Sequence, residues 1–228
     1  MKRLVVDEQM DAPNLPAQVY KAVLDDLARV NRITFASRPT LGFLAGAIGN
    51  RDHFRLLDVG FGQGDMLRAI ARWAQRRGIT AELTGVDLNP NSEIVARAAT
   101  DPALPIRFRT GDYRAEAGQG YDFVVSSLVA HHMSAGELVA FLRFMEDQAG
   151  IGWFVNDLHR HRLAYAGFPL LARLFGWHKI VREDGRASVG RAFKASEWHA
   201  LLAQAEIPSG VASVDRHFPF RLCVARRR

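Results

Sequence analysis

Three glycines stand at alternate positions directly after an apolar stretch, in the segment LLDVGFGQGD at residues 56–65. Glycine permits a positive φ and lets the backbone come close to a ligand. A strand that turns through such glycines into a helix is typical of nucleotide-type cofactor sites, because the N–H groups at the helix start can bind an anion. The spacing is G-x-G-x-G and not the dinucleotide spacing G-x-G-x-x-G. This difference argues against a nicotinamide cofactor.

Polar residues also follow the next three predicted strands. Asp87 ends the second strand, Asp112 follows the third, and Ser127 and the pair His131-His132 follow the fourth. The carboxyl ends of strands in a doubly wound sheet converge on one crevice. An acid 20–30 residues after the glycines can accept both ribose hydroxyls, and a second acid can accept an adenine amino proton. We therefore expect these side chains around one cofactor.

The hydrophobic pattern predicts the elements that position these residues. Strands are expected at 55–60, 83–88, 106–109, 121–127 and 152–157, and two more in 210–226 broken around Phe218-Pro219. Helices are expected at 16–35, 40–48, about 65–77, from Asn89-Pro90, at 138–148 after a Ser134 capping box, at 163–174, and from a Ser196 cap to 205, with a polar loop at 182–190. Alternating strands and helices predict a mostly parallel sheet covered on both faces.

The predicted fold is therefore a single Rossmann-like, doubly wound α/β domain over residues 1–228, with a seven-stranded sheet. Residues 1–50 are expected to form an N-terminal helical lid, and residues 158–193 a helical insertion after the fifth strand that shapes the acceptor site. No internal repeat, linker or low-complexity segment interrupts the pattern.

Composition narrows the class of protein. Apolar residues make up 48% and charged residues 24%, as in ordinary soluble globular proteins. The net charge of +6 comes from basic residues spread along the chain, which is weak support for a polyanionic partner. The lone Cys223 excludes an intramolecular disulfide and a CxxC metal site, and no metal is predicted. The acidic Asp7-Glu8 argues against a signal peptide, and residues 41–48 are too short to span a bilayer, so a cytoplasmic enzyme is expected.

Four motifs, in this order and spacing, resemble those of the class I S-adenosylmethionine-dependent methyltransferases, over roughly residues 50–228. LLDVGFGQGD is similar to the family's first motif, TGVDLNP to its acidic second-strand motif, TGDY to its adenine motif, and YDFVVSSLVAHHM to its fourth. The resemblance implies S-adenosyl-L-methionine as cofactor and S-adenosyl-L-homocysteine as product. It extends, through DLARVNR, NDLHRHRLAY and RASVGRAF, to small-molecule enzymes of bacterial secondary metabolism.

The resemblance also implies a cofactor site. Its residues are Asp58, Gly60, Gly62 and Gly64 at the methionine moiety, Asp87 at the ribose, Leu88 and Tyr113 beside the adenine, Asp112 at the adenine amino group, and Ser127 at the methionine amino group. Three of these have ordinary structural alternatives. Asp58 could cap the glycine turn, Asp112 belongs to a common Gly-Asp turn, and Tyr113 could serve in packing alone.

The acceptor end depends on histidines. Methyl transfer from a sulfonium is an in-line displacement, and a hydroxyl acceptor must also lose its proton, which suits a histidine. His131 lies at the same distance from the strand-four acid Asp122 as the base of plant-type small-molecule O-methyltransferases, although the bulky Trp that follows there is missing. His132 and His159 are the other candidate bases. Structural roles remain the alternative for each.

The insertion supplies further candidates for the acceptor pocket. Its aromatic residues Phe168, Phe175 and Trp177 with His178 could wall the pocket or pack an inserted helix pair, and Arg186 and Arg191 could bind an acidic acceptor or lie on the surface.

The leading hypothesis is O-methylation of a phenolic, polyketide or quinone-like small molecule. Methylation of RNA or protein is the second hypothesis. The fourth motif, SSLV, argues against base N-methylation, which uses (D/N)PP(Y/F/W) there. The position of Cys223, far from the crevice in sequence, argues against 5-methylcytosine chemistry. A non-catalytic S-adenosylmethionine-binding protein is the third hypothesis. Loss of the glycines or of Asp87 would favour it, and both are intact. A dehydrogenase would need glycine where Asp65 stands. The expected partner is a small-molecule acceptor and not nucleic acid or a membrane. The sequence leaves open whether the chain forms a homodimer.

Overall fold

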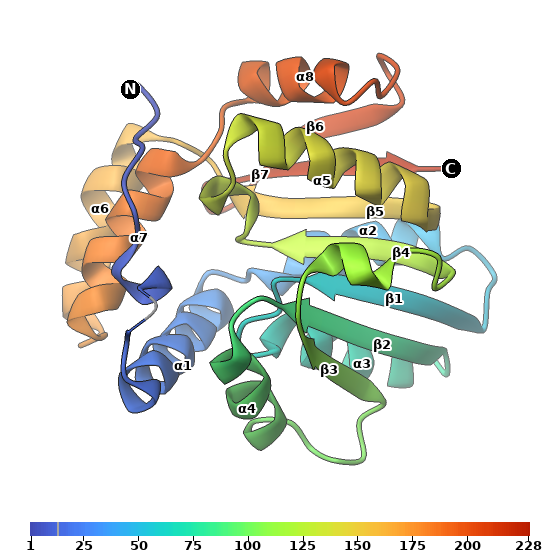
Figure 1. The fold of residues 1–228 in the computed structure, drawn as a ribbon, viewed down its shortest axis with the longest axis horizontal. Coiled ribbons are helices and arrows are strands. Elements are labelled where there is room, and N and C mark those ends of the chain that lie inside the picture. Colours follow the sequence, from blue (N-terminus) through green and yellow to red (C-terminus); the bar gives the residue numbers. More distant parts are fainter. Residues whose placement is uncertain (13) are drawn as a thin grey trace.

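The computed structural model describes residues 1–12 and 14–228. One seven-stranded sheet runs through the molecule in the order β3-β2-β1-β4-β5-β7-β6 (Figure 1). Neighbouring strands from β3 to β5 are parallel, whereas β7 is antiparallel to both β5 and β6. The strands are β1 (His53–Val59), β2 (Thr80–Asp87), β3 (Ile106–Thr110), β4 (Tyr121–Ser127), β5 (Ala149–Leu158), β6 (Ala212–His217) and β7 (Arg221–Arg227).

Helices cover both faces of the sheet. They are α1 (Ala17–Ile33), α2 (Ser37–Ala47), α3 (Asp65–Gln75), α4 (Pro90–Ala98), α5 (Ala135–Gln148), α6 (Arg162–Leu174), α7 (Lys179–Arg191) and α8 (Ala195–Gln204), with 3-10 helices η1 (Gln9–Asp11), η2 (Tyr113–Glu116) and η3 (Ala130–His132). Successive strand residues point to opposite faces. Leu56 accordingly packs with α2 and α3, while Leu57 packs with α5 and α8. The predicted fold class is confirmed.

The starts of two helices show how local sequence sets the element boundaries. Ser134 caps α5 through the predicted capping box, in which its side chain and that of Glu137 each accept a backbone N–H. The expected Ser196 cap is wrong, because α8 begins one residue earlier at Ala195. The backbone N–H of Lys194 donates to Glu197 at 2.7 Å, which fixes the helix start ahead of Ser196.

The expected polar loop at 182–190 is also wrong, because these residues belong to α7. Its two glycines lower the intrinsic helix propensity, but they allow close tertiary packing. A Cβ at Gly185 would lie 2.0 Å from the Phe168 ring, and one at Gly190 would lie 2.4 Å from the Leu4 side chain. Helix packing thus overrides the polar composition of the segment.

The N-terminal segment, α1 and the α6–α7 pair gather beyond the carboxyl ends of the parallel strands, at the left of Figure 1. An apolar cluster joins them, with Val23 and Val30 of α1 packed among Ala172, Trp177 and Val181. These elements therefore close the edge of the sheet at which the predicted site residues end.

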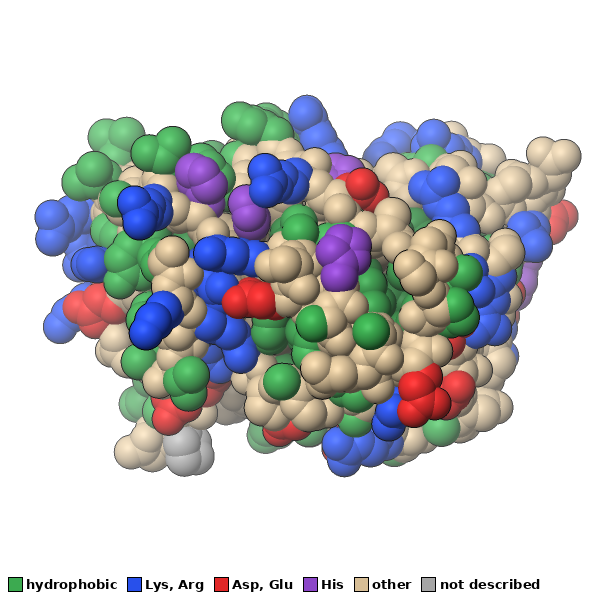
Figure 2. Space-filling model, turned by 90° about the horizontal axis from the view of Figure 1, so that it is seen from above, with side chains coloured by type: hydrophobic (Ala, Val, Ile, Leu, Met, Phe, Trp, Pro, Cys, Tyr) green, Lys and Arg blue, Asp and Glu red, His purple; other side chains and the backbone are tan. Residues whose placement is uncertain are grey.

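The surface carries dispersed positive charge. Figure 2 shows Lys and Arg side chains in several separate groups on the face it presents. Among the described residues, no helix is long and apolar enough to cross a membrane.

Candidate functional site

A cavity of about 920 Å³ lies at the carboxyl ends of the strands, between the glycine turn and the helices α1, α6 and α7. The predicted site residues on its wall are Asp58, Gly60, Gly62, Asp87, Leu88, Tyr113, Ser127, His131 and His132. Gly64, Asp112 and His159 are not on the wall. The cavity therefore joins the predicted cofactor residues to the histidine pair.

The glycine turn is built so that backbone lines the cavity. Gly60 has φ +76°, and a Cβ there would lie 2.3 Å from the Val129 Cγ2 atom. Gly62 has φ +53°, and its N–H donates to Asp87 Oδ2 at 2.9 Å. The positive φ disfavours any side chain at both positions, and at Gly60 the Val129 side chain also leaves no room for one.

Asp87 connects this turn to the end of β2. Its Oδ1 accepts the N–H of Asn89 at 2.9 Å, and its Oδ2 accepts the N–H of Gly62. Burial raises the pKa of Asp87 despite these bonds. Leu88 beside it is 75% exposed at the cavity rim, so its side chain is free to pack on a ligand.

Asp58 is a buried carboxyl without a partner. It is 1% exposed, and neither of its oxygens has a hydrogen-bond partner among the described residues. Burial, reinforced by the charges of Asp65 and Asp87, raises the pKa of Asp58 to about 8. A buried polar group left unpaired is costly. Since Asp58 lines the cavity, a bound cationic group such as an amino group would satisfy it.

The residues predicted beside the adenine differ in position. Tyr113 lines the cavity and packs edge-on against Phe141 and Phe144, with ring centroids 5.0 and 4.8 Å away. Asp112 instead caps η2, where its Oδ1 accepts the N–H of Arg114 at 2.8 Å. Asp112 therefore has the turn-capping role that was its structural alternative, and its contact with adenine stays a prediction.

His131 and His132 lie in η3, directly after β4. His131 is buried, with Nδ1 2.6 Å from Asp157 Oδ1, and its backbone N–H donates to Asp157 Oδ2 at 2.8 Å. Burial alone would raise the pKa of Asp157, but its contacts with His131 hold it below the usual value. His132 is half-buried, with Nδ1 2.8 Å from Asp11 Oδ2. Each ring is therefore oriented by a carboxylate at Nδ1.

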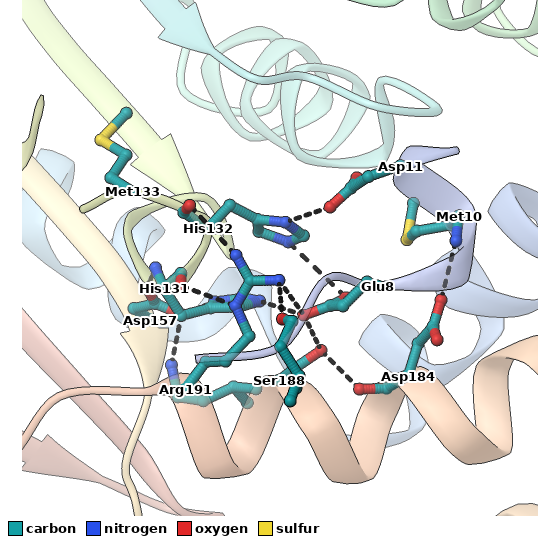
Figure 3. A network of polar contacts seen from close by, with 12 residues as sticks. Glu8, Met10, Asp11, His131, His132, Met133, Asp157, Asp184, Ser188 and Arg191 are labelled. Carbon is teal, nitrogen blue, oxygen red and sulfur yellow. Dashed lines mark hydrogen bonds and ion pairs between the residues drawn. The ribbon is translucent and has the colours of Figure 1, made fainter. Parts of the chain in front are cut away.

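Glu8 faces both Nε2 atoms (Figure 3). Its Oε1 lies 3.7 Å from His131 Nε2, and its Oε2 lies 3.8 Å from His132 Nε2. Ser188 donates its hydroxyl to Oε1 at 2.9 Å, and Nη1 of Arg191 lies 3.7 Å from the same oxygen. Burial raises the pKa of Glu8 to about 7.

Three residues of this cluster were not predicted from the sequence as site residues. Asp157 is the penultimate residue of β5, close to the position that Asp87 has at the end of β2, so the same reasoning could have found it. Glu8 and Asp11 carry no motif. They reach the histidines only because the N-terminal segment packs on α7, where Asp184 accepts the N–H groups of Gln9 and Met10 at 3.0 and 2.9 Å.

His159, the third candidate base, lies outside this cluster. Its ring is paired with His161, at a centroid separation of 5.8 Å, and its backbone N–H donates to Phe220. Burial and the neighbouring charge of Arg216 lower the pKa of His159. The structure therefore does not bring His159 together with the other predicted site residues.

The predicted acceptor residues of the insertion separate into two groups. Phe168 lines the cavity, whereas Trp177 is buried beneath it and stacks on Phe175 at 5.2 Å. His178 caps α7. Neither predicted arginine lines the cavity: Arg186 lies over the Tyr165 ring, and Arg191 donates to the carbonyls of Val6, His131 and His132.

Comparison with known families finds a match to the model described as "Methyltransferase domain", over residues 56–148. This range begins in β1 and ends with α5, so it contains the glycine turn, Asp87 and the histidine pair. No curated protein sequence matches the chain.

Solved structures resemble the whole chain at low sequence identity. The plantazolicin methyltransferase BpumL in complex with SAH aligns with a TM-score of 0.66 at 14% identity, covering 96% of this chain and 92% of that one. Magnesium protoporphyrin IX methyltransferase of Synechocystis PCC 6803 with bound SAH gives 0.58 at 18%, covering 96% and 91%. Human N-acetylserotonin methyltransferase in complex with SAM gives 0.63 at 16%, covering 92% and 56%. These likenesses show a shared fold.

Proposed function

We propose that this chain is a class I methyltransferase that uses S-adenosylmethionine to methylate an oxygen of a small molecule; its methyltransferase-domain match and its fold support the proposal. The observation that carries the proposal is the single cavity that joins the unpaired Asp58 carboxyl and the glycine turn to the histidine pair. A donor and an acceptor can both bind in such a cavity, as a two-substrate transfer requires.

The donor half of the proposal rests on groups that suit the three parts of S-adenosylmethionine. Asp58 can accept hydrogen bonds from the methionine amino group, which would relieve its unpaired burial. Asp87 ends β2 beside the glycine turn, a position at which a carboxylate can accept hydrogen bonds from ribose hydroxyls. Leu88 and Tyr113 offer apolar surface to the adenine ring.

The acceptor half of the cavity is walled by apolar side chains from three helices. They are Leu27 of α1, Phe168 and Leu171 of α6, and Val181 of α7. Such a wall favours a flat, largely apolar acceptor, since burial of apolar surface supplies the binding free energy. Phenolic, polyketide or quinone-like molecules have this character.

Bound S-adenosylmethionine would supply a methyl group on a positively charged sulfur. Helices α1 and α7, which line the cavity, would exclude water and help to hold an acceptor near the methyl group, and such positioning contributes much of the rate enhancement. An acceptor hydroxyl would lose its proton at the cluster of Glu8, His131 and His132. The acceptor oxygen would form a bond to the methyl carbon as the bond between that carbon and sulfur breaks.

The test begins with binding. Calorimetry should show S-adenosylmethionine and S-adenosylhomocysteine binding to the chain, and Asp87→Ala should weaken both at least tenfold. Asp215→Ala, at an exposed position of β6, is the matched control and should bind as the unaltered chain does. Absence of binding, or full binding by Asp87→Ala, would refute the proposal.

The acceptor is then identified by a labelled-methyl screen over phenols, polyketide lactones, quinols and RNA. Label should enter phenols, lactones or quinols and stay out of RNA. Incorporation into RNA alone would instead support the second hypothesis, in which the dispersed basic residues hold a polyanion.

A further inference from the structure

We propose that Glu8, His131 and His132 bind a first-row divalent metal ion, such as Zn²⁺, Mn²⁺ or Co²⁺, at the acceptor end of the cavity (Figure 3). One carboxylate oxygen and the two ring nitrogens lie within 4.8 Å of one another, and all three residues line the cavity. The sequence predicted no metal. The site combines residues more than 120 positions apart, so no spacing motif marks it.

The distances suit ligands of one ion better than hydrogen-bonded partners. The contacts of 3.7 and 3.8 Å between Glu8 and the two Nε2 atoms are too long for hydrogen bonds. Two ligands at about 2.1 Å from a tetrahedral ion are roughly 3.4 Å apart. Side-chain shifts of a few tenths of an ångström at Glu8 would therefore bring it and either histidine to metal-binding distance.

Both histidines are held in the tautomer that metal binding needs. A carboxylate accepts at each Nδ1, Asp157 at 2.6 Å for His131 and Asp11 at 2.8 Å for His132. Because a carboxylate only accepts, Nδ1 carries the proton and the Nε2 lone pair points toward Glu8. Carboxylate–histidine pairs of this kind orient the ligands of metal sites and raise their basicity.

The charges around the cluster leave room for a dication. Acidic side chains outnumber basic ones around the cluster: Glu8, Asp11, Asp157 and Asp184 lie there with Arg3 and Arg191. Arg191 directs its donors to the carbonyls of Val6, His131 and His132, so it holds the backbone instead of neutralising Glu8 fully. This excess of acidic side chains would stabilise a bound divalent cation.

Two nitrogens and one carboxylate oxygen suit zinc, cobalt, manganese or ferrous iron. Three protein ligands leave at least one position open, as in catalytic metal sites. The role inferred here rests on the proposed function: an acceptor hydroxyl would bind the open position and release its proton to water. The resulting oxygen anion would attack the methyl group, forming the O–C bond as the C–S bond breaks. His131 and His132 would then be ligands and not bases.

The test measures metal binding directly on chain freed of metal with a chelator. Co²⁺ should bind with one ion per chain in calorimetry and produce visible d–d absorption, and Zn²⁺ should displace it. His132→Ala and Glu8→Gln should each weaken Co²⁺ binding at least tenfold. His199→Ala, at an exposed position of α8, is the control and should bind Co²⁺ as the unaltered chain does.

A further variant separates ligation from folding. Asp11→Asn leaves all three ligands in place but removes the charge opposite His132 Nδ1, and it should weaken Co²⁺ binding 10- to 100-fold, as such neighbours do elsewhere. Circular dichroism should match the unaltered chain, because about half of the Asp11 side chain is exposed.

S-adenosylhomocysteine binding, measured on the same metal-free chain, keeps this inference distinct from the proposed function. Cofactor binding without Co²⁺ binding would overturn the metal site alone. Co²⁺ bound equally well by Glu8→Gln and His132→Ala would overturn it as well. Loss of cofactor binding in the unaltered chain would overturn the proposed function, whatever the result with Co²⁺.

Discussion

At the scale of single residues, the cavity contains a carboxyl that costs the ligand-free protein stability. Asp58 is buried without a partner, and its pKa is raised to about 8 from an ordinary value near 4. Between these two values the folded chain holds a proton on Asp58 that the unfolded chain does not. The free energy of unfolding must therefore fall as pH rises through this range.

Asp58→Asn removes that titration. We expect the decline in the free energy of unfolding from pH 5 to pH 8 to be shallower in Asp58→Asn than in the unaltered chain, measured by urea unfolding without ligand. The same variant should bind S-adenosylmethionine at least tenfold more weakly, because the amide lacks the charge that the ammonium group needs. Asp215→Asn serves as the control. Identical pH slopes in all three proteins would show that Asp58 is not protonated when buried.

Gly60 tests the geometry of the turn. Gly60→Ala would place a methyl group 2.3 Å from the Val129 side chain at a positive φ, so we expect a loss of about 1–3 kcal/mol in stability by thermal unfolding. Gly136→Ala is the matched control, since no atom lies within 4 Å of its added Cβ. That control should be neutral or slightly stabilising. Equal losses in the two variants would contradict the packing argument.

At the scale of elements, the sequence predicted the sheet and its covering helices well, because strand and helix periods follow directly from burial. Leu56 and Leu57, for example, lie on opposite faces, as consecutive residues of a predicted strand should. The error at α7 has a physical cause. Its glycines and polar side chains resemble a loop locally, and only contacts with Phe168, Leu4 and the N-terminal segment make the helix favourable.

The link between α7 and the N-terminal segment depends on Asp184. Its carboxylate accepts the N–H groups of Gln9 and Met10, which hold η1 against the helix. In Asp184→Ala these two amides should exchange with deuterium at least tenfold faster, because their acceptor is lost. Asp147→Ala, at an exposed position of α5, should leave their exchange unchanged. Unaltered exchange in Asp184→Ala would mean that other contacts hold the segment.

At the scale of the whole molecule, the two ends of the cavity differ in how far apart in sequence their residues lie. The glycine turn and Asp87 lie within about 30 residues and could be predicted as a motif. The acceptor end joins Glu8 and Asp11 to His131, His132 and Asp157 across most of the chain. Only the three-dimensional packing reveals that combination, since no local pattern records it.

This division predicts that the two ends can be inactivated separately. S-adenosylhomocysteine at one hundred times its Kd should stabilise the unaltered chain by about 2.7 kcal/mol, a rise in Tm of roughly 5–10 °C. Asp87→Ala should lose most of that rise and keep the Co²⁺ absorption, because its carboxylate accepts from Gly62 and Asn89 and makes no hydrogen bond to the three proposed metal ligands. Glu8→Gln should keep the rise and lose the absorption. If each variant lost both responses, the donor and acceptor ends would form one cooperative unit, and the separation drawn from their contacts would be wrong.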